Sequence, residues 1–301
     1  MTMKRTSLTS GQEEQYRRLV ADAARHGASL ALKKVGLDKD GLQRLLGRGD
    51  QLKAALAELI VAKSRELSIS DKFADEEVKS SYAYPGGYKL KGLTEQTNIL
   101  RQLFPGVGYS DPDLREKAVT GKLALPENAE GWFAIPRWEK FAPTYGEAVQ
   151  VVLAKLGSTR PFHNYCEGQL GPDRLRQREK TVKMFQMLGN QQKGDILIAP
   201  AQCGLLHRGR SVQRARWVFK TNEFGLGSFA IACMLLTHKE RLVQWEQLHI
   251  DCAGDEYAPG AGGQFLGAPC FDWGGGELGF CADWYGYADA SYGSASGFFP
   301  Q

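Results

Sequence analysis

Residues 194–220 constrain this chain more than any other stretch, because a short apolar run, a loop and a helical pattern follow one another there. Residues 196–198 are apolar and lie between Gly194 and Pro200. A run that short, bounded by residues that break regular structure, is typical of a buried strand. The chain is therefore expected to combine strands and helices within one domain.

A helix is expected to begin at Ser211, whose hydroxyl group can accept a hydrogen bond from the free N–H groups of the first turn. Val212, Ala215 and Phe219 have helical spacing and form an apolar face. Arg208 and the arginine at position 210 come directly before this helix. A helix N-terminus attracts anions, and guanidinium groups add bidentate donors that suit phosphate or carboxylate. The pattern predicts an anion site.

The opposite interpretation is that these arginines pair with acidic residues of the same chain. Residues 160–220 contain twelve Lys or Arg and four Asp or Glu, whereas residues 221–301 contain two basic and ten acidic residues. The basic block can face a polyanion, or the two blocks can neutralise each other. Composition does not decide between these alternatives.

The domain organisation is predicted from changes of pattern along the chain. Residues 1–67 have helical periodicity and are expected to form a helical region that serves as a bundle or an oligomerisation arm. Residues 68–93 lose that periodicity and are interpreted as a linker. Residues 94–301 are expected to form the main domain, with residues 131–301 as its core unit.

The main domain is expected to be of mixed composition, with a β-rich C-terminal end. Pro172 is expected to start a helix with a basic outer face, and three glycines from Gly274 separate two strand-like runs that suggest a β-hairpin. The predicted fold class is therefore α+β, or mixed α/β. The basic residues of the proposed anion site are Arg174, Arg176, Arg178, Arg208, Arg210, Ser211 (as the helix cap), Arg214 and Arg216.

The expected location is cytoplasmic. No segment approaches the roughly 20 apolar residues that span a bilayer, and the N-terminus lacks the apolar core of a secretion signal. Six cysteines without an export signal suggest reduced thiols. No membrane partner is expected.

Metal binding is considered in two forms. Asp251, Asp255 and Glu256 follow a strand-like run, and their hard oxygen ligands suit Mg²⁺. A solvated acidic loop, or a partner for the basic block, is the alternative. A mixed Zn²⁺ site is the second form, formed by His163, Cys166, Cys203 and His207.

Catalysis is a further possibility. His207, Asp251 and Glu256 are candidates for proton transfer. Cys203 or Cys252, paired with a histidine, is a candidate thiol nucleophile. Buried cysteines are commonly small apolar residues, however. No nucleotide-binding, metalloprotease or serine hydrolase motif supports an enzyme.

From about residue 84 onward, the chain resembles a family of uncharacterised bacterial proteins from candidate-phyla genomes. The resemblance implies a bacterial, cytoplasmic setting and one unit for residues 131–301, and it assigns no catalytic residue. The stretches that carry it are EGWFAIPRWEKFAPTY (130–145), EGQLGP (167–172), GDILIAPAQ (194–202), HRGRSVQRAR (207–216), NEFGLG (222–227), IDCAGDE (250–256) and GSASGF (293–298).

The functional hypothesis from sequence is a cytoplasmic protein that binds a phosphate-rich partner, above all nucleic acid, through the arginine-rich helix start. Trp217 or Tyr165 would stack on bases. The first alternative is an enzyme acting on a small anionic substrate, with or without a metal ion. The second is an interaction protein whose charged blocks pair internally or between subunits.

Overall fold

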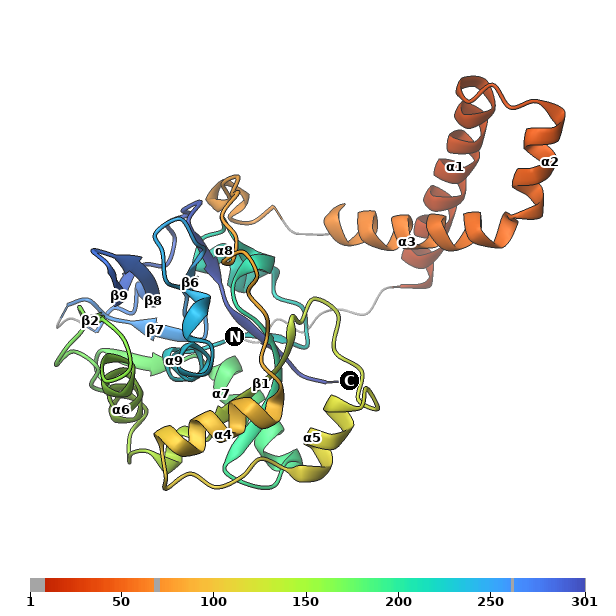
Figure 1. Cartoon of the computed structure of the whole chain (residues 1–301). Coiled ribbons are helices and arrows are strands. Elements are labelled where there is room, and N and C mark those ends of the chain that lie inside the picture. The colour runs from red at the N-terminus through yellow and green to blue at the C-terminus, as the bar shows by residue number, and fades with distance from the viewer. Residues whose placement is uncertain (1–8, 68–70, 261–262, 301) are drawn as a thin grey trace. The chain divides into compact units, whose positions relative to one another are not determined.

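The computed structural model describes residues 9–67, 71–260 and 263–300. These residues form an α+β fold with helices at the N-terminus and a β-rich C-terminal end, which confirms the predicted fold class (Figure 1). The chain divides into two compact units, residues 1–70 and residues 71–301. Each unit is described by itself.

The first unit consists of three helices, and the remaining elements belong to the second unit. The α-helices are α1 (Ser10–Lys34), α2 (Lys39–Gly47), α3 (Gly49–Leu67), α4 (Leu93–Leu103), α5 (Pro112–Val119), α6 (Tyr145–Gly157), α7 (Glu179–Gln191), α8 (Val212–Val218) and α9 (Ser228–Thr237). The 3-10 helices are η1 (Ala74–Glu76), η2 (Trp138–Lys140), η3 (Leu205–His207) and η4 (Lys239–Arg241). The strands are β1 (Gly131–Pro136), β2 (Phe162–Asn164), β3 (Leu175–Gln177), β4 (Ile196–Gln202), β5 (Glu223–Gly225), β6 (His249–Asp251), β7 (Asp255–Tyr257), β8 (Gly267–Gly274), β9 (Glu277–Trp284), β10 (Tyr292–Ser294) and β11 (Ser296–Phe298).

The helices of the first unit have polar caps and few tertiary contacts. The side chains of Thr9 and Gln12 form a capping box at α1, and the Asp38 carboxylate caps α2. The hydroxyl groups of Tyr16 on α1 and Ser64 on α3 lie 2.6 Å apart. No described side chain of α1 or α2 is buried. This unit therefore has little core of its own.

The segment expected to be a linker, residues 68–93, is part of the second unit from Asp71 onward. Residues 68–70 lie outside the described residues. The N–H group of Val78 donates to the carbonyl oxygen of Gly209 at 2.7 Å, and Ala83 forms a β-bridge with Gln247. Residues 71–83, called here the strap, thus pair with the rest of the second unit.

The smaller sheet of the second unit is antiparallel and has the order β1-β4-β11-β5. Every residue of β4 is buried. The strand predicted at residues 196–198 is confirmed as part of β4, and residues 131–136 form its neighbour β1. Their continuous apolar runs follow from burial on both faces.

The larger sheet has seven strands and is built around the β8–β9 hairpin. β6 and β7 pair with β8, whereas β2 pairs with β9, and β10 and β3 extend the sheet from β6 and β7. The hairpin turn contains Gly275 and Gly276, both with positive φ, so the predicted glycine turn is confirmed. Figure 1 shows β2, β8 and β9 on the side of the unit that carries α6.

The hydrophobic core is centred on α9, which is buried along its whole length. Its sequence is apolar on all sides, as expected for a helix surrounded by protein. It packs on β1, α4 and α6. α6 follows its N-cap Thr144, which forms a capping box with Glu147. Caps and apolar faces in the sequence therefore position the core correctly.

One predicted element differs from the structure. The helix expected from Pro172 begins only at Glu179, because residues 175–177 pair with β7 as strand β3. The chain after residue 238 forms the single turn η4, and α4 has Gly92 as its N-cap.

The expectation that all six cysteines are free thiols is corrected. Cys270 and Cys281 form a disulfide between β8 and β9, and the other four cysteines are free and buried. Disulfides are typical of oxidising compartments, so the cytoplasmic location stays a prediction. Among the described residues, no helix is long and apolar enough to cross a membrane.

Candidate functional site

The arginines before and within α8 are held by the strap, residues 71–83. Arg210 and Arg214 both form ion pairs with the Glu77 carboxylate, and Nε of Arg210 lies 3.3 Å from it. Nη1 of Arg214 also donates to the Lys72 carbonyl oxygen at 2.8 Å. Nη1 of Arg208 donates to the Tyr82 carbonyl oxygen at 3.1 Å. These guanidinium groups therefore have partners inside the chain.

A second carboxylate of the strap, that of Glu76, contacts the start of α8. The Ser211 hydroxyl group accepts a hydrogen bond from the Arg214 N–H group at 2.9 Å, which confirms the predicted cap. The same hydroxyl group donates to the carboxylate of Glu76. Glu76 and Glu77 thus occupy the place that the sequence suggested for an anionic ligand.

The remaining arginines of the basic block contact β7 and its neighbours. Arg176 and Arg178 each lie 2.9 Å from the Glu256 carboxylate. Arg174 donates to the Ala258 carbonyl oxygen at 3.2 Å. The Arg216 guanidinium donates to the carbonyl oxygens of Ala253 and Asp255, and its burial lowers its pKa to about 9.

The pairing that the sequence raised as the alternative is therefore present. One acidic residue of the last third of the chain, Glu256, pairs with Arg176 and Arg178, whereas Glu77 of the strap pairs with Arg210 and Arg214. Binding of nucleic acid at these residues stays a prediction. Each of these guanidinium groups has a structural role, because it forms an ion pair within the fold.

His207 belongs to a buried polar network. Its Nε2 lies 2.7 Å from Oε1 of Glu223, and its Nδ1 lies 3.1 Å from Nη1 of Arg210. The Ser296 hydroxyl group donates to the same Glu223 oxygen at 2.6 Å. His207 is 3% exposed and Glu223 is 1% exposed. A proton donor or acceptor enclosed in this way serves the core and has no access to a substrate.

The three proposed Mg²⁺ ligands have separate surroundings. Asp255 is buried and accepts hydrogen bonds from the Tyr145 hydroxyl group and the Ser228 N–H group at 2.9 and 2.6 Å, and burial raises its pKa to about 6. Glu256 pairs with arginines, and Asp251 lies on β6. Within residues 9–67, 71–260 and 263–300, no group of three His, Cys, Asp or Glu could hold a metal ion.

The proposed Zn²⁺ ligands are likewise not assembled. Cys166, Cys203 and His207 are buried and His163 is exposed. Burial raises the pKa of the Cys203 thiol far above its usual range, and that of Cys252 as well. A thiol that stays protonated is a poor nucleophile and a poor metal ligand. These cysteines act as small apolar core residues.

A pocket that the sequence did not predict lies where β1, η2, α7 and α9 meet. Its volume is about 250 Å³. Trp138, Phe185 and Phe229 supply aromatic walls, and buried Ile135 and Leu197 lie at its base. The pocket is therefore a concave, largely apolar site on the second unit.

Three carboxamides line the same pocket with free hydrogen-bonding capacity. Gln177 ends β3, whereas Gln186 and Asn190 are one turn apart on α7. None of the three side chains has a hydrogen bond to any residue that the structure describes. A carboxamide can both donate and accept hydrogen bonds, so these groups are available to a ligand.

Arg137 supports the wall of the pocket. Its guanidinium donates to the carbonyl oxygens of Gly189, Gln192 and Gly194 at 2.7, 2.9 and 2.9 Å. A cation at the C-terminal end of α7 is favourable for the helix dipole. A Cβ atom at Gly189 would lie 2.4 Å from Nη1 of Arg137, so glycine permits this close approach. Arg137, directly after β1, thus holds the C-terminal end of α7, whose side chains line the pocket.

One signal in the sequence pointed toward this pocket. Val182, Gln186 and Asn190 lie at four-residue spacing on α7, beside the apolar positions that face the core. Two carboxamides in line with an apolar residue interrupt the apolar side of the helix. Periodicity alone does not show that β1 and α9 approach the same place.

Comparison of the chain with protein-family models, with curated proteins and with solved structures gave no match.

Proposed function

We propose that the second unit binds a small, neutral, hydroxyl-bearing molecule of the size of a sugar in the pocket lined by Trp138. The observation that carries this proposal is the set of three carboxamides without internal hydrogen-bond partners around an aromatic-walled pocket of about 250 Å³. Ligand sites are commonly apolar concavities with a few well-placed polar groups.

The chemistry of the lining supports a neutral ligand. Arg137 is committed to three carbonyl oxygens, and Glu139 is exposed at the rim. The remaining polar groups are carboxamides, which match hydroxyl groups because both can donate and accept. An aromatic wall suits the apolar face of a sugar ring. The volume is below the roughly 300–1,000 Å³ of sites for drug-sized ligands, which favours a small molecule.

The lining supports binding more than catalysis. It contains no Ser, Cys, His or Asp, and its one carboxylate belongs to Glu139. A general acid–base or nucleophilic mechanism requires a positioned pair of such groups. We therefore propose a binding function for this pocket.

The test is titration of the full chain with neutral sugars, followed by tryptophan fluorescence and calorimetry. Replacing Gln186 and Asn190 together by alanine is expected to weaken binding by about tenfold or more, at roughly 1 kcal/mol for each lost hydrogen bond. Gln191→Ala is the matched control, because Gln191 is exposed at the end of the same helix and does not line the pocket. Failure of every neutral sugar to bind, or equal weakening by the control, would refute the proposal.

The hypotheses from the arginine block remain separate proposals. Nucleic-acid binding requires affinity that falls steeply with salt concentration. An enzyme for a small anionic substrate requires thermal stabilisation by that substrate. The internal ion pairs support the third hypothesis, a structural role for the charges, because Glu77 and Glu256 each pair with two arginines.

A further inference from the structure

One face of the larger sheet carries acidic and aromatic side chains. Side chains of adjacent strands that are paired in register point to the same face. By this rule the register places Asp251 beside Cys270, and Tyr292 beside His249. The opposite face bears Phe271 and its neighbours of the core. The residues of the first face, called here the acidic face, are His249, Asp251, Cys270, Asp272, Cys281, Asp283, Tyr292 and Ser294.

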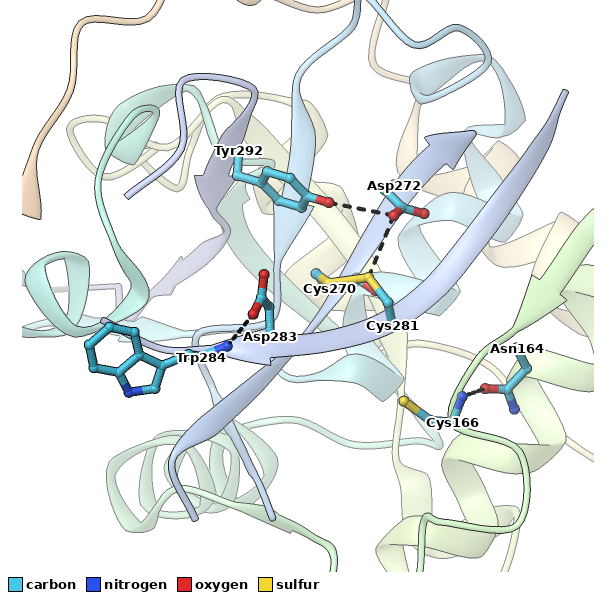
Figure 2. The surroundings of a disulfide bond; sticks show 8 residues. All are labelled: Asn164, Cys166, Cys270, Asp272, Cys281, Asp283, Trp284 and Tyr292. Atoms are coloured by element: carbon cyan, nitrogen blue, oxygen red, sulfur yellow. Dashed lines mark hydrogen bonds between the residues drawn. A yellow bond between two sulfur atoms is a disulfide. The ribbon is translucent and has the colours of Figure 1, made fainter. Parts of the chain in front are cut away.

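The carboxylates of this face form no ion pair with any residue that the structure describes. Figure 2 shows Asp272 and Asp283 near the disulfide, with the Tyr292 hydroxyl group directed at Asp272. The Tyr292 oxygen lies 3.5 Å from Oδ2 of Asp272. Asp289, in the loop before β10, accepts hydrogen bonds from Ser291. None of Asp251, Asp272, Asp283 and Asp289 forms an ion pair within the described part of the chain.

Two arginines lie near the acidic face and are already engaged. The positive charge of Arg216 opposes the rise in the pKa of Asp251, but its guanidinium donates its hydrogen bonds to two carbonyl oxygens. The positive charge of Arg241 contributes to the lowered pKa of His249. Its guanidinium donates to the carbonyl oxygens of Leu248 and Cys203, both at 2.9 Å. The face therefore keeps an excess of negative charge, consistent with the acidic composition of residues 221–301.

An independent observation at the same face is a buried polar side chain without a side-chain partner. His249 is 0% exposed, and no described side chain forms a hydrogen bond with its ring nitrogens, which have only the Trp245 backbone as a polar neighbour. Its ring lies between those of Trp245 and Tyr292, with centroids 5.1 and 4.9 Å away. The hydroxyl oxygen of Ser294, on the same face, is also buried and unpartnered. Buried polar groups in native proteins nearly always have partners.

The protonation of His249 fits an acceptor role. Burial lowers its pKa, against the opposing effect of Asp272, the Trp245 backbone and Asp289. The ring is therefore neutral at pH 7, and one nitrogen can accept a hydrogen bond. Two rings pack on it, the exposed Trp245 and the half-buried Tyr292, and binding at the nitrogen requires one of them to turn aside.

We propose that the acidic face binds an organic polycation, with one ammonium or guanidinium group held by Asp272 and the ring nitrogen of His249 and a second held by Asp283, on the other side of the disulfide. Aromatic rings near the carboxylates add cation–π attraction. An organic cation is favoured over a metal ion, because no described cluster of His, Cys, Asp or Glu could hold a metal. The group can belong to a free polyamine or to a basic peptide, and the test separates these sources.

The experiment titrates the full chain at low ionic strength with spermidine in one arm and with a short oligoarginine peptide in the other. Binding is measured by calorimetry, and the ring resonances of the histidines are followed by NMR. Asp283→Asn, at an exposed position, is expected to weaken binding several-fold, and the double variant with Asp272→Asn by about tenfold or more. Glu95→Gln, an exposed acidic residue on α4, is the matched control and should bind as the wild type does.

Binding of spermidine alone would assign the site to free polyamines, and binding of the peptide alone would assign it to basic chains. A shift of the buried His249 ring resonances on binding supports its part in the site. The proposal is overturned if neither cation binds, or if the Asp283→Asn variant binds like the control. These outcomes are independent of the sugar titration, because the pocket lined by Trp138 shares no residue with the acidic face.

Discussion

The Glu77 carboxylate pairs with two arginines at once, one just before α8 and one within it. Glu77 is distant from both in the sequence. Its carboxylate pairs with Arg210 and with Arg214, whose side chain is 6% exposed. These pairs and hydrogen bonds lower the pKa of Glu77 although burial opposes the shift. A buried guanidinium that loses its carboxylate keeps the cost of desolvation without the compensating attraction.

We expect Glu77→Gln to lower the free energy of unfolding by about 1–3 kcal/mol, because Glu77 itself is partly exposed. Chemical denaturation of both proteins measures the difference. Glu116→Gln is the control, since Glu116 and Lys122 are 3.8 Å apart and both well exposed. An exposed pair of this kind contributes about 0–1 kcal/mol. Equal stability of Glu77→Gln and the wild type would contradict a structural role for these arginines.

Asp251 predicts a dependence of stability on pH. Burial raises its pKa to about 7, with Arg216 opposing and Asp283 and Asp289 adding to the shift. A carboxyl group with a raised pKa in the folded state binds its proton more tightly when folded. Its favourable contribution is therefore present at acidic pH and is lost as the pH rises from about 4 to about 7.

Replacement by asparagine removes this titration. The stability of Asp251→Asn relative to the wild type is expected to increase by about 2–4 kcal/mol between pH 4 and pH 8. Denaturation curves at several pH values measure this difference. Asp173→Asn, at an exposed position, provides the control and should show no such trend. A constant difference across the pH range for Asp251→Asn would show that its carboxyl group titrates normally.

At the level of elements, the β8–β9 hairpin depends on more than its turn. The Cys270–Cys281 disulfide joins two residues that face each other across the strands, 11 positions apart in the sequence. A cross-link of this separation stabilises by restricting the unfolded chain, by about 3 kcal/mol at most. The hairpin carries Asp272 and Asp283 on the face of the disulfide, so the cross-link also keeps the acidic face in shape.

Replacing both cysteines by alanine is expected to lower the free energy of unfolding by about 2–3 kcal/mol. Reductant is expected to destabilise the wild type by a similar amount and to leave the double variant unchanged, which serves as the control. Thiol titration of the unfolded protein checks the pairing directly. Six reactive thiols in the protein as isolated would contradict the disulfide.

Local signals in the sequence predicted several elements correctly, whereas pairings between distant residues were not predictable. Ser211 caps α8 as expected, and the apolar run at residues 196–198 forms a central strand. Arg176 was expected on a helix but lies on β3, because its neighbours pair with β7. That choice depends on a partner strand about 80 positions away, which periodicity does not reveal.

The site illustrates the same limit. The arginines of the basic block were identified correctly as a group that needs negative charge, but the sequence did not show that Glu77 supplies it. The pocket lined by Trp138 combines residues of β1, α7 and α9, whose approach depends on tertiary packing. Apart from the four-residue spacing of Val182, Gln186 and Asn190 on α7, their own segments do not single these residues out. Their chemistry emerges only when the chain is folded.

At the level of the whole molecule, the two units differ in how they are stabilised. The second unit, residues 71–301, contains the buried core and both proposed binding sites. The first has exposed apolar side chains, among them Leu19, Leu32 and Leu46, and no buried side chain in α1 or α2. Helices without a core are marginally stable in water.

We therefore expect residues 71–301 alone to unfold cooperatively at the same temperature as the main transition of the full chain, because removal of residues 1–70 leaves the core intact. Calorimetry of the two proteins measures this. The contrasting variant lacks residues 1–83 and therefore also Glu76 and Glu77. It should unfold at a lower temperature, because it leaves Arg214 without the Glu77 carboxylate. The same proteins test the predicted oligomerisation arm by light scattering: a larger assembly for the full chain and a monomer for residues 71–301 would assign association to α1–α3. If removal of residues 1–70 lowers the unfolding temperature as much as removal of residues 1–83 does, the stable unit does not begin at the strap.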